Sequence, residues 1–202
     1  VIQSGGGAIA HAAHQAGALF LVGVDPSSLG VLAPPAAYGA DIVVGDLQPL
    51  GIHMQFGGGL AGFIALQDDP RLVMELPTRL VGITGTAVSG EYGFGEVAFA
   101  RTSFIGREKG KEYVGTGTNL WGIVAGVYLA LMGLTGMREL GEAIMQRTRY
   151  AMRGIAAVPG LSIPAETEPH FKEFVVDFTR TGKSVAEINR GFVRRMLTGR
   201  PW

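Results

Sequence analysis

Few side chains in this 202-residue sequence could act as nucleophiles or metal ligands. It contains no cysteine, so it has neither a thiolate nucleophile nor a disulfide, a usage that fits a reducing cytoplasm. Its four histidines are His11, His14, His53 and His170, and the first two have i, i+3 spacing. No acidic residue lies between those two, unlike the arrangement in a zinc-binding helix. The sequence therefore predicts no metal site.

Two glycine-rich stretches could bring the backbone close to a ligand. The turn at residues 4–7 has neither the G-x-G-x-x-G spacing nor the Gly-Lys-Ser/Thr ending of phosphate-binding loops, which favours a simple turn before a helix. Gly57, Gly58 and Gly59 end a long loop, and loops of that length in a compact domain usually have a function. These glycines either let another chain approach closely or supply the positive φ angles of a tight turn.

The charge balance argues against nucleic-acid and membrane partners. The 17 basic and 17 acidic residues give a net charge of zero, so no long-range field attracts a polyanion. Hydrophobic residues make up 47% and charged residues 17%, which indicates extra surface buried against a partner, although 32 glycines and many alanines also raise the apolar share. The sequence starts at Val1 without a signal-peptide pattern, and we expect residues 1–3 to end a strand of a fragment or processed C-terminal portion.

Alternating helical and extended patterns predict an α/β fold for the first part of the chain. An alanine-rich helix closed by Gly17 precedes continuous apolar runs typical of strands buried on both faces of a parallel sheet. The segment 29–38 is a connecting loop or short surface helix, and Asp69 with Pro70 starts a short helix over 71–76. The predicted strands are 18–24, 41–45, 62–66, 80–86 and 95–101, the last two forming an antiparallel hairpin.

The second part of the chain is mainly helical in pattern. A polar, exposed segment at 102–119 precedes an apolar stretch at 120–134, which is shorter than the ~20 residues needed to span a bilayer and predicts a buried core helix. Thr135 caps a second helix at 135–157. Strands are expected at 161–163 and 173–178. A last helix at 183–197 begins with the capping box of Ser184 and Glu187.

Four segments of the sequence carry a family resemblance. They are AHQAGALFLVGVDPSSLGVLAPPAAYGADIVVGDLQPLG, FGGGLAGFIA, LPTRLVGITG and VYLALMGLTGMRELGE. In this order they resemble the glycine decarboxylase P-protein, specifically subunit 1 (α) of its two-subunit form. Subunits of that family are longer, so the resemblance implies that their N-terminal half is absent here.

The resemblance implies a fold, an activity and partners. The fold is the aspartate-aminotransferase-like fold of pyridoxal-phosphate (PLP) enzymes, with part of the large, mainly parallel domain at 1–115 and the small C-terminal α/β domain at 116–202. The activity is glycine dehydrogenase (decarboxylating) of the glycine cleavage system, an oxidoreductase of glycine catabolism. A lysine of the β subunit holds the cofactor, and the aminomethyl group of glycine passes to the lipoyl arm of the carrier (H) protein. The implied complex is a cytoplasmic heterotetramer.

The resemblance also implies that this chain has lost its own cofactor anchors. Leu50 stands at the position of the β subunit's Schiff-base lysine, and a leucine cannot form an imine. The aspartate that pairs with the pyridine nitrogen falls near Val22 or Gly23 and not on Asp25. The remaining lysines are interpreted as solvated charges; they are Lys109, Lys111, Lys172 and Lys183. The chain is therefore expected to be a pseudo-enzyme subunit, non-catalytic by itself.

Such a subunit is expected to complete the partner's active site with polar side chains. The candidates are Gln48, His53 and Gln55 on the loop after the second strand, and Arg107 in the polar segment. Two of them have structural alternatives. His53 is a satisfied structural histidine in one, and Arg107 is an exposed ion-pair partner of Glu108 or Glu112 in the other.

One departure from the family pattern leaves the substrate open. The segment FIGREKGKEYVGTGTN keeps Arg107-Glu108-Lys109 and Thr118-Asn119 of the family's stretch and little else. A paralogue acting on another amino acid is therefore an alternative. So are a structural or regulatory subunit that completes no active site, and an independent transferase whose lysine lies upstream.

Overall fold

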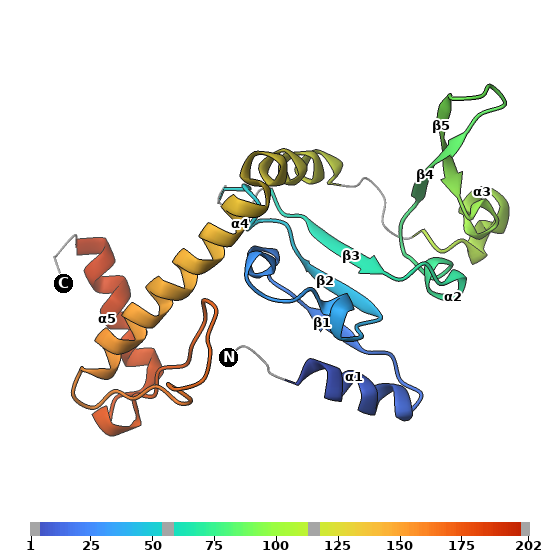
Figure 1. The fold of residues 1–202 in the computed structure, drawn as a ribbon. Coiled ribbons are helices and arrows are strands. Elements are labelled where there is room, and N and C mark those ends of the chain that lie inside the picture. The colour runs from blue at the N-terminus through green and yellow to red at the C-terminus, as the bar shows by residue number, and fades with distance from the viewer. Residues whose placement is uncertain (1–4, 54–58, 113–117, 199–202) are drawn as a thin grey trace. The chain divides into compact units, whose positions relative to one another are not determined.

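The computed structural model describes residues 5–53, 59–112 and 118–198 in two compact units. One unit contains residues 5–6, 27–32 and 132–198, and the other contains Gly7–Pro26 and Ala33–Leu131. Both β-sheets belong to the second unit (Figure 1). The strand expected at residues 1–3 lies outside the described residues, and the division at residue 115 stays a prediction.

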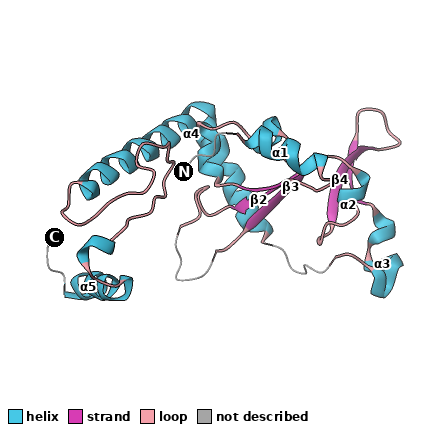
Figure 2. Ribbon diagram, turned by 90° about the horizontal axis from the view of Figure 1, so that it is seen from below, coloured by secondary structure: helices cyan, strands magenta, loops and turns pink. Residues whose placement is uncertain are grey.

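A three-stranded sheet with the order β1-β2-β3 is the centre of the second unit. Strand β1 (Leu21–Gly23) pairs parallel with β2 (Ile42–Asp46), and β2 pairs antiparallel with β3 (Gly62–Leu66), so that β2 and β3 run side by side (Figure 2). Helix α1 (Gly6–Gln15) precedes β1 and is followed by Gly17 at φ +70°. The α/β prediction is confirmed, although β1 is shorter than the predicted strand at 18–24.

Two 3-10 helices, η1 (Pro26–Gly30) and η2 (Pro35–Tyr38), connect β1 to β2. Prolines start both, because a fixed φ suits the first position of a helical turn. Gly39 then takes φ +95°, and a Cβ there would lie 3.0 Å from the Cβ of the buried Ala10 in α1. The glycine thus lets the chain pass close to α1 before it enters β2.

The predicted hairpin is present with a shifted second strand. Strand β4 (Leu80–Gly85) pairs antiparallel with β5 (Tyr92–Val97), and Ile83 lies opposite Phe94. The second strand begins at Tyr92 instead of residue 95, because Thr86 N–H donates to Glu91 O at 3.0 Å and continues the ladder into the turn. It ends at Val97 because Ala98 takes φ 54°. Helix α2 (Pro70–Val73) precedes the hairpin, and the Asp69 side chain caps it.

A buried arginine fixes the segment that follows β5. The Arg101 side chain, 5% exposed, donates to the carbonyl groups of Leu76 and Thr78. Lys111 Nζ forms an ion pair with Glu75 Oε2 at 2.7 Å. These contacts hold three short helices against the chain before β4; they are η3 (Phe99–Arg101), α3 (Ser103–Gly106) and η4 (Arg107–Lys109). The segment predicted to be exposed therefore starts with a buried residue, Thr102.

The helices predicted at 120–134 and 135–157 form one element, α4 (Asn119–Ala156), interrupted by non-helical angles at Gly133. Its apolar part is not a buried core helix, contrary to prediction. By length and composition alone, α4 is long and apolar enough to cross a membrane. Its apolar 18-residue window is 11% buried. One face packs, with Ala125 buried and Tyr128 against Gly51, while Leu131 is 81% exposed. The apolar pattern predicted a helix packed against other residues on all sides. Among the described residues, it is packed on one side.

The C-terminal region confirms one prediction and corrects another. The strands expected at 161–163 and 173–178 are absent from the described residues, which have a single bridge between Ser162 and Asp177 there. The Asp177 carboxylate accepts from Thr179 N–H at 2.9 Å, and this local turn, continued by η5 (Thr179–Thr181), competes with a strand. Helix α5 (Val185–Thr198) has the predicted capping box: Ser184 N–H donates to Glu187 Oε2 at 2.8 Å, and Glu187 N–H donates to Ser184 Oγ at 3.3 Å.

Two helical glycines of α4 provide a matched test of packing. A Cβ on Gly141 would lie 2.8 Å from Val31 Cγ1, whereas a Cβ on Gly154 meets no atom within 4 Å. We expect Gly141→Ala to lower the free energy of unfolding by about 1–3 kcal/mol through overpacking. Gly154→Ala should raise it by about 0.5–1 kcal/mol through helix propensity. Denaturant unfolding of both variants checks this, and equal effects would contradict the Val31 contact.

Candidate functional site

The carboxyl ends of β1 and β2 lie at the same edge of the sheet, the place where ligands bind in parallel α/β folds. Val24 N–H donates to Val44 O at 2.9 Å and extends the pairing by one residue. Asp25, partly buried, follows β1, and Asp46, exposed, ends β2. The sequence pattern did not single out Asp46. The loop that carries the predicted site residues continues from it.

The loop after β2 is held together largely by its own backbone. Leu47 N–H donates to Ala61 O at 2.9 Å, Leu50 N–H to Leu47 O at 2.9 Å, and Ile52 N–H to Gln48 O at 3.2 Å. The Gln48 side chain joins this network, because its Oε1 accepts from Ala61 N–H at 3.3 Å. Gln48 therefore ties the start of the loop to the start of β3. This contact is a structural one.

Leu50 is the buried anchor of the loop. It is 4% exposed, and its neighbour Ile52 is 7% exposed. Gly51 between them takes φ +82°, and a Cβ on it would lie 2.7 Å from Tyr128 Cδ2 of α4. A side chain at residue 51 would thus clash with the helix and be strained as well. The loop consequently turns an apolar side chain inward at the position where the resemblance implies a lysine in the partner.

The structure describes three of the four predicted site residues. His53 is exposed, which disfavours the satisfied structural histidine, and Gln55 lies outside the described residues. Arg107 is exposed on η4. Within residues 5–53, 59–112 and 118–198, no hydrogen bond or ion pair joins Gln48, His53 and Arg107. Gln48, His53 and Gln55 follow one another on the loop after β2. That they come together with Arg107 in one site stays a prediction.

Arg107 has a strained backbone. It takes φ 47° and ψ −121°, a region that favours glycine, and its carbonyl accepts from Gly110 N–H at 2.9 Å in a tight turn. The expected ion pair with Glu112 is not formed. Glu112 Oε1 instead accepts from Ser103 N–H at 2.5 Å and Ser103 Oγ–H at 2.6 Å, which holds the pKa of Glu112 below its ordinary value. The guanidinium of Arg107 makes no ion pair within the described part of the chain.

The residues at the expected anchor positions do not fit a covalently held PLP. Leu50 offers no amine, and neither Val22 nor Gly23 offers a carboxylate for a pyridine nitrogen. A metal ion has no better site in the part of the chain that the structure describes, where no three His, Asp or Glu side chains come together to hold one.

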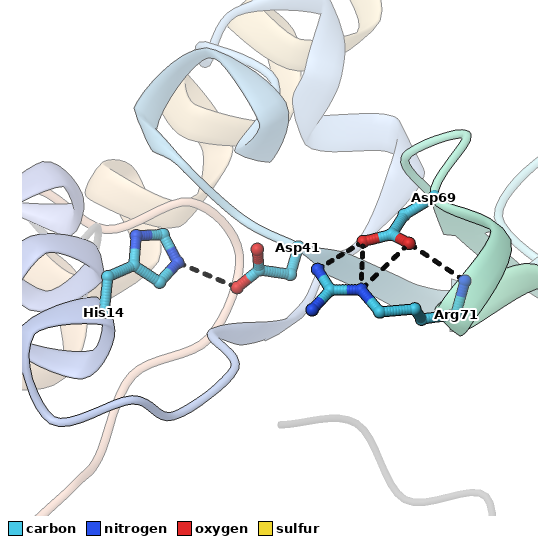
Figure 3. Close-up of polar contacts among 4 residues, drawn as sticks. All are labelled: His14, Asp41, Asp69 and Arg71. Carbon is cyan, nitrogen blue, oxygen red and sulfur yellow. Dashed lines mark hydrogen bonds and ion pairs between the residues drawn. The ribbon is translucent and has the colours of Figure 1, made fainter.

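The clearest pair of titratable side chains lies at the opposite, amino end of β2. His14 Nε2 lies 2.8 Å from Asp41 Oδ2 (Figure 3). The same oxygen accepts from Phe20 N–H at 2.7 Å. The Phe20 hydrogen bond and then His14 lower the pKa of Asp41. This pair ties α1 to the start of β2, so it is structural. A second pair in the same view, Asp69 with Arg71, caps α2 (Figure 3).

The lowered pKa of Asp41 makes a prediction about acid stability. A carboxyl group whose pKa is lowered on folding stabilises the fold above its unfolded pKa of about 3.9, and this contribution is lost as the pH falls through the lower, folded pKa. We therefore expect wild type to be more stable than Asp41→Asn at pH 6, and the difference to shrink below about pH 4. Thermal unfolding of both proteins from pH 2.5 to 7 measures it. A difference that does not change with pH would contradict the assignment.

The strain at Arg107 predicts a stabilising substitution. Arg107→Gly should raise the free energy of unfolding by roughly 1 kcal/mol, because glycine adopts positive φ without steric cost. The matched control is Lys109→Gly, an exposed neighbour in the same 3-10 helix without positive φ, which should be neutral or destabilising. Denaturant titrations decide between them. A loss of stability in Arg107→Gly would show that its side chain supports the fold.

Comparisons with known proteins place the chain among its relatives. Residues 5–195 match the family model for the glycine cleavage system P-protein. The chain is 44% identical to the probable glycine dehydrogenase (decarboxylating) subunit 1 of Saccharolobus islandicus strain L.S.2.15 over 161 residues, 80% of this chain and 35% of that protein. It is 39% identical to the protein of the same description from Desulforamulus reducens over 193 residues, 96% of this chain and 42% of that protein.

A solved structure agrees with these sequence matches. A crystal structure of glycine decarboxylase (P-protein) of the glycine cleavage system, in inhibitor-bound form, superposes with a TM-score of 0.81 and 39% identity. The match covers 94% of this chain and 42% of that one, so the chain spans about two-fifths of the length of its relatives. The family model covers nearly the whole sequence, and the chain therefore belongs to the glycine cleavage system P-protein family.

Proposed function

We propose that this chain acts as subunit 1 of a glycine dehydrogenase (decarboxylating) and supports an active site whose lysine belongs to a partner subunit. The observation that carries the proposal is the buried Leu50, in a loop with no lysine between residues 39 and 62. An amine at residue 50 would need space and solvation that this apolar position does not provide. Because the chain spans two-fifths of its relatives, the activity, glycine as substrate and all partners are part of the proposal.

We also propose the fold, the cofactor, the partner proteins and the cellular location that the family resemblance implies. Residues 1–115 belong to the large domain of an aspartate-aminotransferase-like fold and residues 116–202 to its small domain. The PLP and its lysine belong to a β partner, a lipoyl carrier protein receives the aminomethyl group, and the complex is a cytoplasmic heterotetramer. The parallel β1–β2 pair supports only the α/β part of this proposal.

Exposed polar groups are this chain's contribution to the proposed site. His53 and Arg107 are exposed and can donate hydrogen bonds to a partner or a substrate carboxylate, and Gln55 has the same proposed role. Gln48 differs from these, since its Oε1 is already used by Ala61 N–H. We therefore assign Gln48 a positioning role, in which it holds the loop that presents His53.

A second candidate function is a structural or regulatory subunit of a P-protein-like complex that acts on another substrate. The bond between Gln48 and Ala61 favours it, because the side chain of a predicted site residue here ties the loop to the start of β3. In that case the loop keeps the family shape for packing, and His53 contributes nothing to catalysis.

Reconstitution tests the leading proposal. The chain is mixed with a lysine-bearing subunit 2 of the family, PLP and a lipoyl carrier, and exchange of the glycine carboxyl carbon with bicarbonate is measured. We expect exchange in the complete mixture and none with this chain alone, because Leu50 cannot form an imine. The chain alone should also lack the visible absorbance of an internal aldimine. Exchange or aldimine absorbance without the partner would overturn the proposal.

Variants of the loop separate the two functions in the same assay. His53→Ala should lower kcat about tenfold or more if His53 supports the partner's site. The matched control is His11→Ala, which removes an exposed histidine from α1. Gln48→Glu, which keeps an acceptor for Ala61 N–H, should retain more activity than Gln48→Ala. Unchanged activity in His53→Ala with an intact complex would favour the structural subunit.

A further inference from the structure

Helix α4 is interrupted next to the point where the chain passes from one compact unit to the other. The second unit ends at Leu131, and the first unit continues from Met132. Gly133 takes φ 59° and ψ −173°, which are not helical angles. Positive φ combined with ψ near 180° is a conformation that essentially only glycine adopts. The interruption of the helix therefore coincides with the boundary between the units.

The half of α4 before Gly133 is packed within the second unit. Ala125 is 3% exposed. A Cβ on Gly51 would lie 2.7 Å from Tyr128 Cδ2, so this half of the helix lies directly against the loop after β2. Gly51, Ala125 and Tyr128 all belong to the second unit. We therefore expect this half of α4 and the loop after β2 to move together.

The half of α4 after Gly133 is packed within the first unit, against residues 27–32. A Cβ on Gly30 would overlap the carbonyl oxygen of Met137, and a Cβ on Gly141 would lie 2.8 Å from Val31 Cγ1. These close approaches fix the second half of the helix to a segment that precedes it by about a hundred residues in the sequence. The two halves of one helix are thus held by two different units.

The interruption itself is loosely surrounded. A Cβ on Gly133 would meet no described atom within 4 Å, and the neighbouring Leu131 and Leu134 are 81% and 94% exposed. The chain also crosses between the units at residues 26–27 and 32–33. Residues 24–25 and 33–34, beside these crossings, lie outside the helices and strands. All three connections therefore have backbone that can absorb the changes in φ and ψ that a hinge requires.

We propose that Gly133 is a hinge about which the first unit rotates relative to the second. The half of α4 before Gly133 then moves with the loop after β2, and the half after it moves with residues 27–32. Hinge rotation of this kind opens and closes binding clefts in proteins with two domains. The proposal rests on the backbone of Gly133 and on the packing of the two helix halves, and it does not depend on the proposed function.

Distances between spin labels on the two halves of α4 test the proposal in the full 202-residue chain. The chain has no cysteine, so Ile123→Cys combined with Tyr150→Cys supplies one labelled pair at residues that are 64% and 82% exposed. In a continuous helix these residues would be about 40 Å apart. We expect pulsed electron paramagnetic resonance to give a broad distribution centred below that distance. Gly133→Ala should narrow the distribution and shift it toward about 40 Å, because alanine disfavours positive φ.

Two controls make the result specific to Gly133. Leu134→Cys combined with Tyr150→Cys places both labels after the interruption and should give a narrow distribution near about 24 Å. Gly126→Ala replaces another glycine of α4 whose Cβ would meet no atom within 4 Å and whose φ is not positive. It should leave the distribution of the Ile123→Cys/Tyr150→Cys pair unchanged.

The hinge would be overturned by a distribution across Gly133 that is as narrow as the one within the second half of α4. It would also be overturned if folded Gly133→Ala, verified by circular dichroism, gave the same distribution as the unsubstituted chain. If Gly133→Ala does not fold, the comparison of the two labelled pairs decides alone. The measurement uses no enzymatic activity, so failure of the proposed function gives a separate result.

Discussion

The parallel pairing of β1 with β2 is the constraint on which the rest of the second unit depends. Parallel strands cannot be joined by a tight turn, so the chain needs a crossover, here built from η1 and η2. The same pairing puts the ends of both strands at one edge, which fixes where the loop after β2 starts. That loop then reverses the chain into the antiparallel β3, and the Gln48–Ala61 bond ties its two ends. The strand register of this sheet therefore fixes where the crossover and the loop after β2 begin and end.

In its described part, the loop after β2 is fixed by hydrogen bonds and by the burial of apolar side chains. Its hydrogen bonds run mainly between backbone groups, and its apolar anchors are Leu50 and Ile52. None of these contacts requires an ionisable side chain. Leu50 is held there by the burial of its apolar side chain. The glycine pattern of the loop therefore carries the family resemblance, and the residue at position 50 does not.

Local signals were readable from the sequence, and contacts between distant residues were not. The runs at 41–45 and 62–66, the cap at Asp69 and the capping box at Ser184 each depend on neighbouring residues and were predicted within a residue or two. The prediction of a strand at 173–178 was wrong, because the local turn at Asp177 competes with extended structure. Burial of Arg101 was missed, since it depends on carbonyl groups 23 and 25 residues away. The solvent-exposed face of α4 was not predicted for the same reason. An apolar sequence favours burial of a helix, but only the fold shows which residues pack against it.

The segment from Arg101 to Glu112 shows where strain can persist in such a chain. Arg101 is fixed to Leu76 and Thr78, Glu112 to Ser103, and Lys111 to Glu75, so both ends of the segment are anchored. A strained residue persists when its surroundings over-determine its conformation, and Arg107 lies between these anchors. The strain therefore has a local cause in the anchored ends. As a result, the exposed and permanently charged guanidinium of Arg107 lies on a turn whose two ends are fixed. A cation on a mobile loop would lose more conformational entropy on binding a carboxylate than this one does.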